Sequence, residues 1–248
     1  MSGRMVFITG TGTGVGKTIA TAGIVGALRA CGLAALPAKP LQTGAPRDDA
    51  GHWLAPDLVY TLAANQIAAD RALLDTLAPF CFAMPASPHL AAAAEGRRVS
   101  VEEVARSMQH ATYHAELLVA EGAGGLLVPL NDHETMADLI TALGAPVIVV
   151  ATTGLGTINH TLLTLAELKR RGASVVGCLY MQHQTPADEH DAAIERDNPA
   201  TIARLSGVPT LGVIPPFGII DNPEAFPHNE FFAALKEPRA LAERLAHG

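Results

Sequence analysis

The sequence predicts an α/β fold in which a mainly parallel sheet is flanked by helices. Short apolar runs alternate along the chain with longer segments of helical periodicity. Several of these runs are apolar on both faces, which is typical of parallel strands covered by helices. A glycine-rich segment follows the first run and leads directly into the first helical segment. The 248 residues fit one large domain or two small ones, and because nothing marks a second domain we expect a single domain over residues 1–248.

Six apolar runs are the expected strands: Met5–Ile8, Leu33–Ala38, Leu117–Ala120, Val147–Ala151, Ser174–Met181 and Thr210–Ile214. The expected helices between them are Lys17–Cys31, Val101–Ala115, Glu134–Leu143 and Asn159–Arg171. Ser100 and Glu103 have the spacing of a capping box at the start of the second of these helices. Gly144 and Gly172 follow the last two helices, where a left-handed C-cap is expected. The stretch Gln42–Pro56 is rich in Gly, Pro and Asp and is expected to be a loop.

Composition and charge narrow the class of protein. Apolar residues make up 49% of the chain and charged residues 17%, which excludes global disorder. With 17 Lys and Arg against 24 Asp and Glu, the net charge of −7 argues against a nucleic-acid binder. No secretory signal or long apolar run is present, so no membrane span is expected. The cysteines Cys31, Cys81 and Cys178 lie far apart and are expected to be buried, reduced thiols of a cytoplasmic protein.

The strongest local signal is the segment Thr9–Thr18, TGTGTGVGKT, between the first expected strand and the first expected helix. This context is typical of a P-loop, in which backbone N–H groups surround phosphate oxygens at a helix N-terminus. Lys17 would then reach the β- and γ-phosphates, and Thr18 would place its hydroxyl on Mg²⁺. The spacing is a variant, because Thr11 occupies the usual position of the first glycine and Gly10 precedes it.

Three other nucleotide-binding classes fit the sequence less well. A dinucleotide-binding turn needs a glycine where Val15 stands, and an acidic residue at the end of the second strand, where the chain has Lys39. The Asn-Lys-x-Asp base reader of GTPases is absent. Partitioning ATPases with a deviant P-loop would carry a second lysine at the position of Gly12.

Candidate charged residues lie at the ends of two further strands. Lys39 follows the second expected strand, and parallel sheets place ligands beyond such strand ends, although a solvated lysine there is the plain alternative. Glu121 follows the strand Leu117–Ala120 and precedes small residues, which is the position of a Walker B carboxylate. Asp57 is a further candidate magnesium ligand, although N-capping alone would explain it. Asp48 and Asp49 compete with Asp57 for that role.

Five motifs, taken together and in order, resemble those of the dethiobiotin synthetases: TGTGTGVGKT, AKPLQTG, PASPH, AEGAGGLLVPL and LGTINH. The resemblance covers Met5 to Phe217, and the tail from Gly218 to Gly248 matches poorly. It implies a P-loop NTPase domain that works as a homodimer. It also implies closure of a cyclic urea from 7,8-diaminononanoate and CO₂ with ATP and Mg²⁺. In that reaction a carbamate attacks the γ-phosphate of ATP, and the second amine then captures the resulting carbamic–phosphoric anhydride.

The resemblance also assigns expected roles to individual residues. The catalytic lysines would be Lys17 and Lys39. The magnesium ligands would be Thr18, Asp57 and Glu121. The diamine would contact Thr13, Lys39, Thr43 and, at the dimer interface, Asn159 of the other subunit. The ATP contacts would be Gly14, Val15, Gly16, Lys17, Thr18, Ile19, Asp57, Glu121, Gly122, Ala123, Gly124, Gln182, His183, Pro215, Pro216, Phe217 and Glu224.

The chain departs from the commonest family pattern at two places. Gly12 and Gly14 occupy P-loop positions that often carry acidic residues. Gln182 and His183 stand where the base-binding segment often has Asn-Asp, which leaves the base preference open. Two other functions on the same fold are alternatives. They are an ATP-driven switch of the partitioning type, which lacks its second P-loop lysine here, and an amidoligase acting on another carboxylated metabolite.

Overall fold

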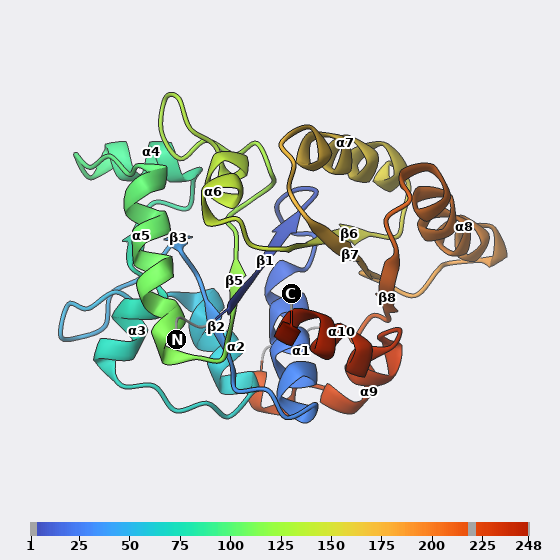
Figure 1. Ribbon diagram of the computed structural model, residues 1–248, viewed down its shortest axis with the longest axis horizontal. Helices are drawn as coiled ribbons and strands as arrows, with labels where there is room; N and C mark the ends of the chain where they lie inside the picture. Colours follow the sequence, from blue (N-terminus) through green and yellow to red (C-terminus); the bar gives the residue numbers. More distant parts are fainter. Residues whose placement is uncertain (1–3, 218–221, 248) are drawn as a thin grey trace.

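The computed structural model describes residues 4–217 and 222–247. Its centre is a six-stranded sheet in the order β2-β5-β1-β6-β7-β8, in which every pair of neighbours is parallel (Figure 1). The strands are β1 (Arg4–Gly10), β2 (Ala35–Ala38), β5 (Leu117–Glu121), β6 (Val147–Thr152), β7 (Val175–Met181) and β8 (Thr210–Ile214). Their carboxyl ends therefore lie along one edge of the sheet, which is where such folds bind ligands.

The helices cover both faces of the sheet. They are α1 (Lys17–Ala30), α2 (Pro56–Ala64), α3 (Arg71–Leu77), α4 (Pro88–Ala94), α5 (Val101–Ala111), α6 (Met136–Leu143), α7 (Thr157–Arg170), α8 (Glu189–Ser206), α9 (His228–Ala234) and α10 (Pro238–His247), with short 3-10 helices η1 (Thr112–His114) and η2 (Pro223–Ala225). Val6 and Ile8 of β1 pack into the core that α1, α9 and α10 share, whereas Phe7 packs into the core on the side of α5, α6 and α7. Burial on both faces explains why the strands are apolar at successive positions.

The six expected strands and four expected helices are confirmed, with differences at their ends. The structure starts the second strand at Ala35, and its α-helix from Val101 stops at Ala111 before a 3-10 turn. Gly144 and Gly172 have φ of 62° and 72°, as left-handed C-caps require. The capping box at Ser100 is also present.

A small second sheet was not expected. β3 (Leu41–Thr43) and β4 (Phe80–Phe82) pair in parallel beside the main sheet. The expected loop Gln42–Pro56 is therefore wrong at both ends, because Gln42 and Thr43 belong to β3 and Pro56 begins α2. Strands this short have no recognisable periodicity, and their pairing depends on a partner distant in the sequence.

The cysteines differ in their surroundings. All three are free thiols; Cys81 and Cys178 are buried, and burial raises the pKa of these thiols to about 11 and about 12, respectively. Cys31 is only half-buried, so the expectation of burial is wrong there. It occupies the C-cap position of α1, where the helix leaves the core. Within residues 4–217 and 222–247, the structure contains no helix that is long and apolar enough to cross a membrane.

The described part of the C-terminal tail, residues 222–247, packs closely against the helix that follows the P-loop (Figure 1). Phe231 of α9 is fully buried, and a Cβ added at Gly23 of α1 would lie 2.3 Å from its ring. One turn further on, a Cβ at Gly26 would lie 2.4 Å from His228 Nδ1. The other nitrogen of His228 lies 2.7 Å from the Ala64 carbonyl at the end of α2. The tail therefore joins α1 to α2, and the glycines of α1 allow this close approach.

We predict that Gly23→Ala destabilises the protein. Helix propensity alone would favour alanine by up to ~1 kcal/mol, but overpacking a filled core costs about 1–3 kcal/mol. The urea midpoint should therefore fall, and it should recover in part in the double variant Gly23→Ala/Phe231→Leu. Gly154→Ala is the control, because no heavy atom lies within 4 Å of the added Cβ. A midpoint equal to or above that of the unmodified chain would contradict the account.

Candidate active site

The segment between β1 and α1 forms a tight loop at the carboxyl edge of the sheet. Gly14 and Gly16 have φ of 74° and 92°, a left-handed conformation that favours glycine. A Cβ at Gly10 would lie 2.7 Å from Val15 Cγ2, so the chain needs a glycine at that position rather than at Thr11. The close packing of Val15 across the loop thus accounts for the variant spacing of the motif.

Lys17 is the first residue of α1 and is 7% exposed. Its Nζ donates a hydrogen bond to the Gly12 carbonyl at 2.8 Å. Burial, and next the positive charge of Lys39, lower the pKa of Lys17 to about 8, although Glu121 and Asp57 act in the opposite direction. Two buried lysines close enough to repel each other favour the binding of an anion between them.

Lys39, at the end of β2, forms the centre of the site. It is 4% exposed, and its Nζ lies 2.6 Å from Asp57 Oδ2 and 2.6 Å from Glu121 Oε1. Glu121 Oε1 also accepts a hydrogen bond from the Thr18 hydroxyl at 3.0 Å. Burial alone would lower the pKa of Lys39, but the attraction of Glu121 and Asp57 outweighs it and raises that pKa. Lys39 is therefore a permanent cation at neutral pH, and the alternative of a solvated lysine is wrong.

A cavity of about 420 Å³ brings most of the expected site residues together. It is lined by Thr13, Gly14, Gly16, Lys17, Thr18, Ile19, Lys39, Gln42, Thr43, Asp57, Glu121, Ala123 and Gly124. Val15 is buried and does not line the cavity, and the Gly122 carbonyl accepts a hydrogen bond from Lys39 Nζ at 3.3 Å. Residues from four separated stretches of the chain thus meet in one polar cavity.

A second group of expected residues lies outside this cavity, at the ends of β7 and β8. Gln182 donates its backbone N–H to the Ile214 carbonyl, which holds the two strand ends together. His183 and Pro215 are exposed, Pro216 and Phe217 are half-buried, and Glu224 is exposed on η2. Asn159 is exposed on the first turn of α7 and does not line the cavity.

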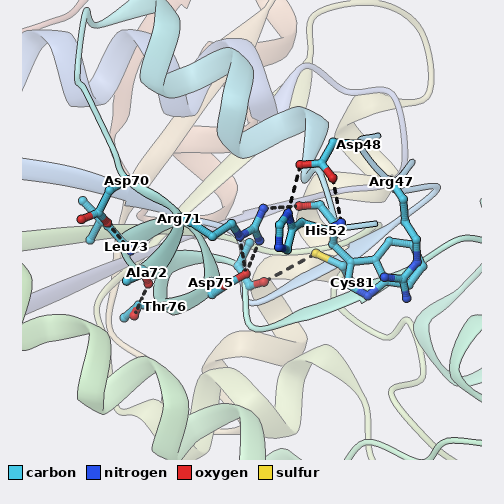
Figure 2. Close-up of polar contacts among 12 residues, drawn as sticks. Arg47, Asp48, His52, Asp70, Arg71, Ala72, Leu73, Asp75, Thr76 and Cys81 are labelled. Carbon is cyan, nitrogen blue, oxygen red and sulfur yellow. Dashed lines mark hydrogen bonds and ion pairs between the residues drawn. The ribbon is translucent and has the colours of Figure 1, made fainter. Parts of the chain in front are cut away.

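The structure separates the three aspartates that competed as metal ligands. Asp57 lines the cavity, whereas Asp48 and Asp49 do not. Asp48 instead closes a turn by accepting hydrogen bonds from the N–H groups of Ala50 and His52. The bond from His52 is the main reason that the pKa of Asp48 is lowered, and Figure 2 shows these two residues together. Of these three aspartates, only Asp57 therefore remains a candidate metal ligand.

The turn that contains Asp48 is fastened to α3 (Figure 2). The guanidinium of Arg47 lies 3.7 Å from the centre of the Trp53 ring. Arg71 of α3 donates to the Trp53 carbonyl at 2.9 Å and pairs with Asp75. These contacts hold the segment between β3 and α2 in a closed hairpin, so the positions of Thr43 and Asp57 at its two ends are fixed.

Sequence reasoning missed Gln42, which is 6% exposed. Its side-chain oxygen accepts the backbone N–H of Asp57 at 3.3 Å, and its nitrogen donates to the Thr43 carbonyl at 3.0 Å. The N-cap residue of α2 is Ala55, which has no side chain that can cap a helix. Gln42 therefore supplies the cap from β3 and positions Asp57. The absence of a capping residue before Pro56 was the one local signal for such a partner.

Comparison with known proteins identifies the family. A family described as an AAA domain matches residues 4–224. ATP-dependent dethiobiotin synthetase BioD of Anaeromyxobacter sp. (strain K) is 44% identical over 219 residues, which cover 86% of this chain and 90% of the relative. BioD of Thermodesulfovibrio yellowstonii is 38% identical, over 84% of this chain and 87% of the relative.

A solved structure, the MinC:MinD cell division protein complex of Aquifex aeolicus, has a similar fold. The TM-score is 0.58 at 13% identity, with 99% of this chain and 96% of the other covered. That likeness supports the P-loop NTPase fold alone. The sequence identity to the BioD proteins is much higher and extends over most of both chains. The chain belongs to the dethiobiotin synthetase family.

Proposed function

We propose that the protein is a ligase of biotin biosynthesis that closes 7,8-diaminononanoate and CO₂ into dethiobiotin with ATP and Mg²⁺, in the cytoplasm where ATP is available. The relatives described above are ATP-dependent dethiobiotin synthetases. The observation that carries the proposal is the convergence of two buried lysines, Lys17 and Lys39, on one cavity with two carboxylates. Such a cavity suits an anionic phosphoryl group between cations and a metal.

The P-loop side of the cavity suits the triphosphate. Backbone N–H groups at the start of α1 and the Lys17 ammonium would bind the β- and γ-phosphates. Besides Lys17, the residues proposed to contact the phosphates and the metal are Gly14, Val15, Gly16, Thr18, Ile19, Asp57, Glu121, Gly122, Ala123 and Gly124. The base would lie beyond β7 and β8, against Gln182, His183, Pro215, Pro216, Phe217 and Glu224.

Thr18, Asp57 and Glu121 fit a magnesium site, since Mg²⁺ prefers hard oxygen ligands and phosphate oxygens. The two carboxylates already accommodate one cation between them, the Lys39 ammonium. When bound, Mg²⁺ would neutralise charge on the β- and γ-phosphate oxygens. Thr18 and Glu121 are already joined by a hydrogen bond, so these two ligands need little rearrangement.

The chemistry divides into three steps. One amine of the diamine adds to CO₂ and loses a proton, which gives a carbamate. A carbamate oxygen of the substrate attacks the γ-phosphorus, the bond to the bridging oxygen of ADP breaks, and a carbamic–phosphoric anhydride forms. The second amine then attacks the carbamoyl carbon, loses a proton and expels phosphate. Thr13 and Thr43 line the cavity and would position the diamine. Lys39 acts as a cation rather than a base, because its raised pKa keeps it protonated while it neutralises the carbamate and the moving phosphoryl group.

The decisive experiment for this function uses the full chain with the diamine, bicarbonate and Mg-ATP. We expect phosphate release that requires the diamine and matches dethiobiotin formed, mole for mole. ATP hydrolysis without the diamine, and without a cyclic urea product, would refute the proposal and favour an ATP-driven switch.

We predict that Lys39→Ala retains ATP binding and loses turnover by roughly 10²–10³-fold or more, the usual effect of removing one transition-state charge partner. Binding is followed by calorimetry and turnover by product formation. Lys169→Ala serves as the control, because Lys169 is exposed on α7. Turnover close to normal in Lys39→Ala would show that this ammonium does not touch the reacting atoms.

We predict that Gln42→Ala raises the Mg²⁺ concentration needed for half-maximal activity several-fold, since a buried hydrogen bond contributes about 0.5–1.5 kcal/mol. At saturating Mg²⁺ the KM for ATP should stay close to normal. The matched control is Gln109→Ala, an exposed glutamine on α5. If Gln42→Ala folds normally and needs no additional Mg²⁺, Gln42 does not position Asp57.

We further propose that two copies of the chain form the working enzyme. Leu127 and Leu163 line an apolar groove next to the P-loop residues Thr11 and Thr13, yet they are 58% and 62% exposed. Large apolar side chains this exposed on one groove indicate a protein contact. Asn159, four residues before Leu163 on α7, would then reach the substrate of the other copy.

We expect Leu163→Arg to shift the protein from dimer to monomer in sedimentation experiments and to raise the KM for the diamine. The matched control is Leu205→Arg on α8, where a leucine of similar exposure, 57%, lies away from the groove. A chain that sediments as a monomer with full activity would contradict the proposal.

A further inference from the structure

Gln182 stands next to the phosphate loop, at the end of β7. The preceding Met181 packs against the loop so closely that a Cβ at Gly16 would lie 2.9 Å from Met181 Cγ. The backbone N–H of Gln182 donates to the Ile214 carbonyl at 2.9 Å, which places the residue where β7 and β8 end side by side. A nucleotide whose phosphates lie in the loop extends along this edge of the sheet.

The side-chain amide of Gln182 is bound by a residue of a neighbouring helix. Its Nε2 donates a hydrogen bond to Glu195 Oε2 at 2.7 Å, and both side chains are half-buried. Glu195 lies on α8, which packs beside β8 at the end of the sheet (Figure 1). An ionised carboxylate can only accept hydrogen bonds, so the nitrogen of the amide must face Glu195 and its oxygen must face away.

Neither partner has a competing strong interaction in the described part of the chain. The neighbouring Arg196 pairs with Glu189 at 2.8 Å, and no ion pair involves Glu195. No described residue donates a hydrogen bond to the Gln182 side-chain oxygen. The Glu195 carboxylate is therefore free to bind the Gln182 amide nitrogen. The amide oxygen of Gln182 remains available to a ligand.

We propose that Glu195 is a positioning residue that fixes the Gln182 amide with its oxygen toward the nucleotide base, so that the site selects a base with an exocyclic amine. The inference rests on the proposed use of a nucleoside triphosphate at the P-loop. Adenine donates a hydrogen bond from its 6-amino group to such an oxygen. A base with a 6-carbonyl group would instead place its carbonyl oxygen against the amide oxygen, and two acceptors cannot form a hydrogen bond. Turning the amide would satisfy the carbonyl base but would place the amide oxygen against the Glu195 carboxylate.

ATP and ITP test the proposal, because ITP has a carbonyl where ATP has the 6-amino group. Affinities are measured by calorimetry on the full chain with Mg²⁺ and without the diamine. We expect ATP to bind about threefold to tenfold more tightly than ITP, the range for one hydrogen bond. In Glu195→Gln the ratio should fall toward one, because glutamine can accept from or donate to Gln182 and the amide can turn. Glu195→Ala should behave alike, and Glu189→Gln, the control on the same helix, should keep the ratio.

A double variant distinguishes the positioning of Gln182 by Glu195 from a nonspecific loss of nucleotide binding. Gln182→Ala should remove the discrimination, and adding Glu195→Gln to Gln182→Ala should change the ratio no further. The proposal is overturned if the unmodified chain binds ATP and ITP equally, if both Glu195 variants keep the ratio, or if they weaken both nucleotides to the same degree. Because no diamine is present, a shifted ratio supports the proposal even if the cyclic urea is never formed.

Discussion

The Lys39 ammonium, held 2.6 Å from both Asp57 and Glu121, is the interaction on which the site depends. It ties together the end of β2, the start of α2 and the end of β5, and Thr18 joins α1 through Glu121. Removing one partner of a buried charge group leaves an uncompensated charge, which typically costs about 3–5 kcal/mol. The same three charges can bind a phosphoryl group and its metal, so one arrangement of side chains contributes both to stability and to ligand binding.

The surrounding structure holds this arrangement in place from several directions. Gln42 caps α2 and so positions Asp57, while Arg71 fastens the hairpin that leads to α2. The C-terminal tail reaches α2 from the other end, through the contact of His228 with the Ala64 carbonyl. A site that combines charges from separate elements needs such rigid support, because electrostatic stabilisation relies on groups that do not have to reorganise.

Much of this could be predicted from local sequence. The P-loop, the strand-end position of Lys39 and the Walker B position of Glu121 all follow from apolar runs that end at a charged residue or a glycine. The two-stranded sheet, the capping role of Gln42 and the contact of Gln182 with Glu195 could not be predicted. Each depends on residues that the fold brings together and that no short-range pattern connects.

The proposed reaction depends on one step, the attack of a carbamate oxygen on the γ-phosphorus of ATP. The most direct measurement follows ¹⁸O from labelled bicarbonate in unlabelled water through one turnover with the diamine, completed before bicarbonate exchanges its oxygen with the water. We expect one labelled oxygen in each phosphate released, because the attacking carbamate oxygen leaves as part of that phosphate. Unlabelled phosphate would contradict this step, because its new oxygen would then come from water.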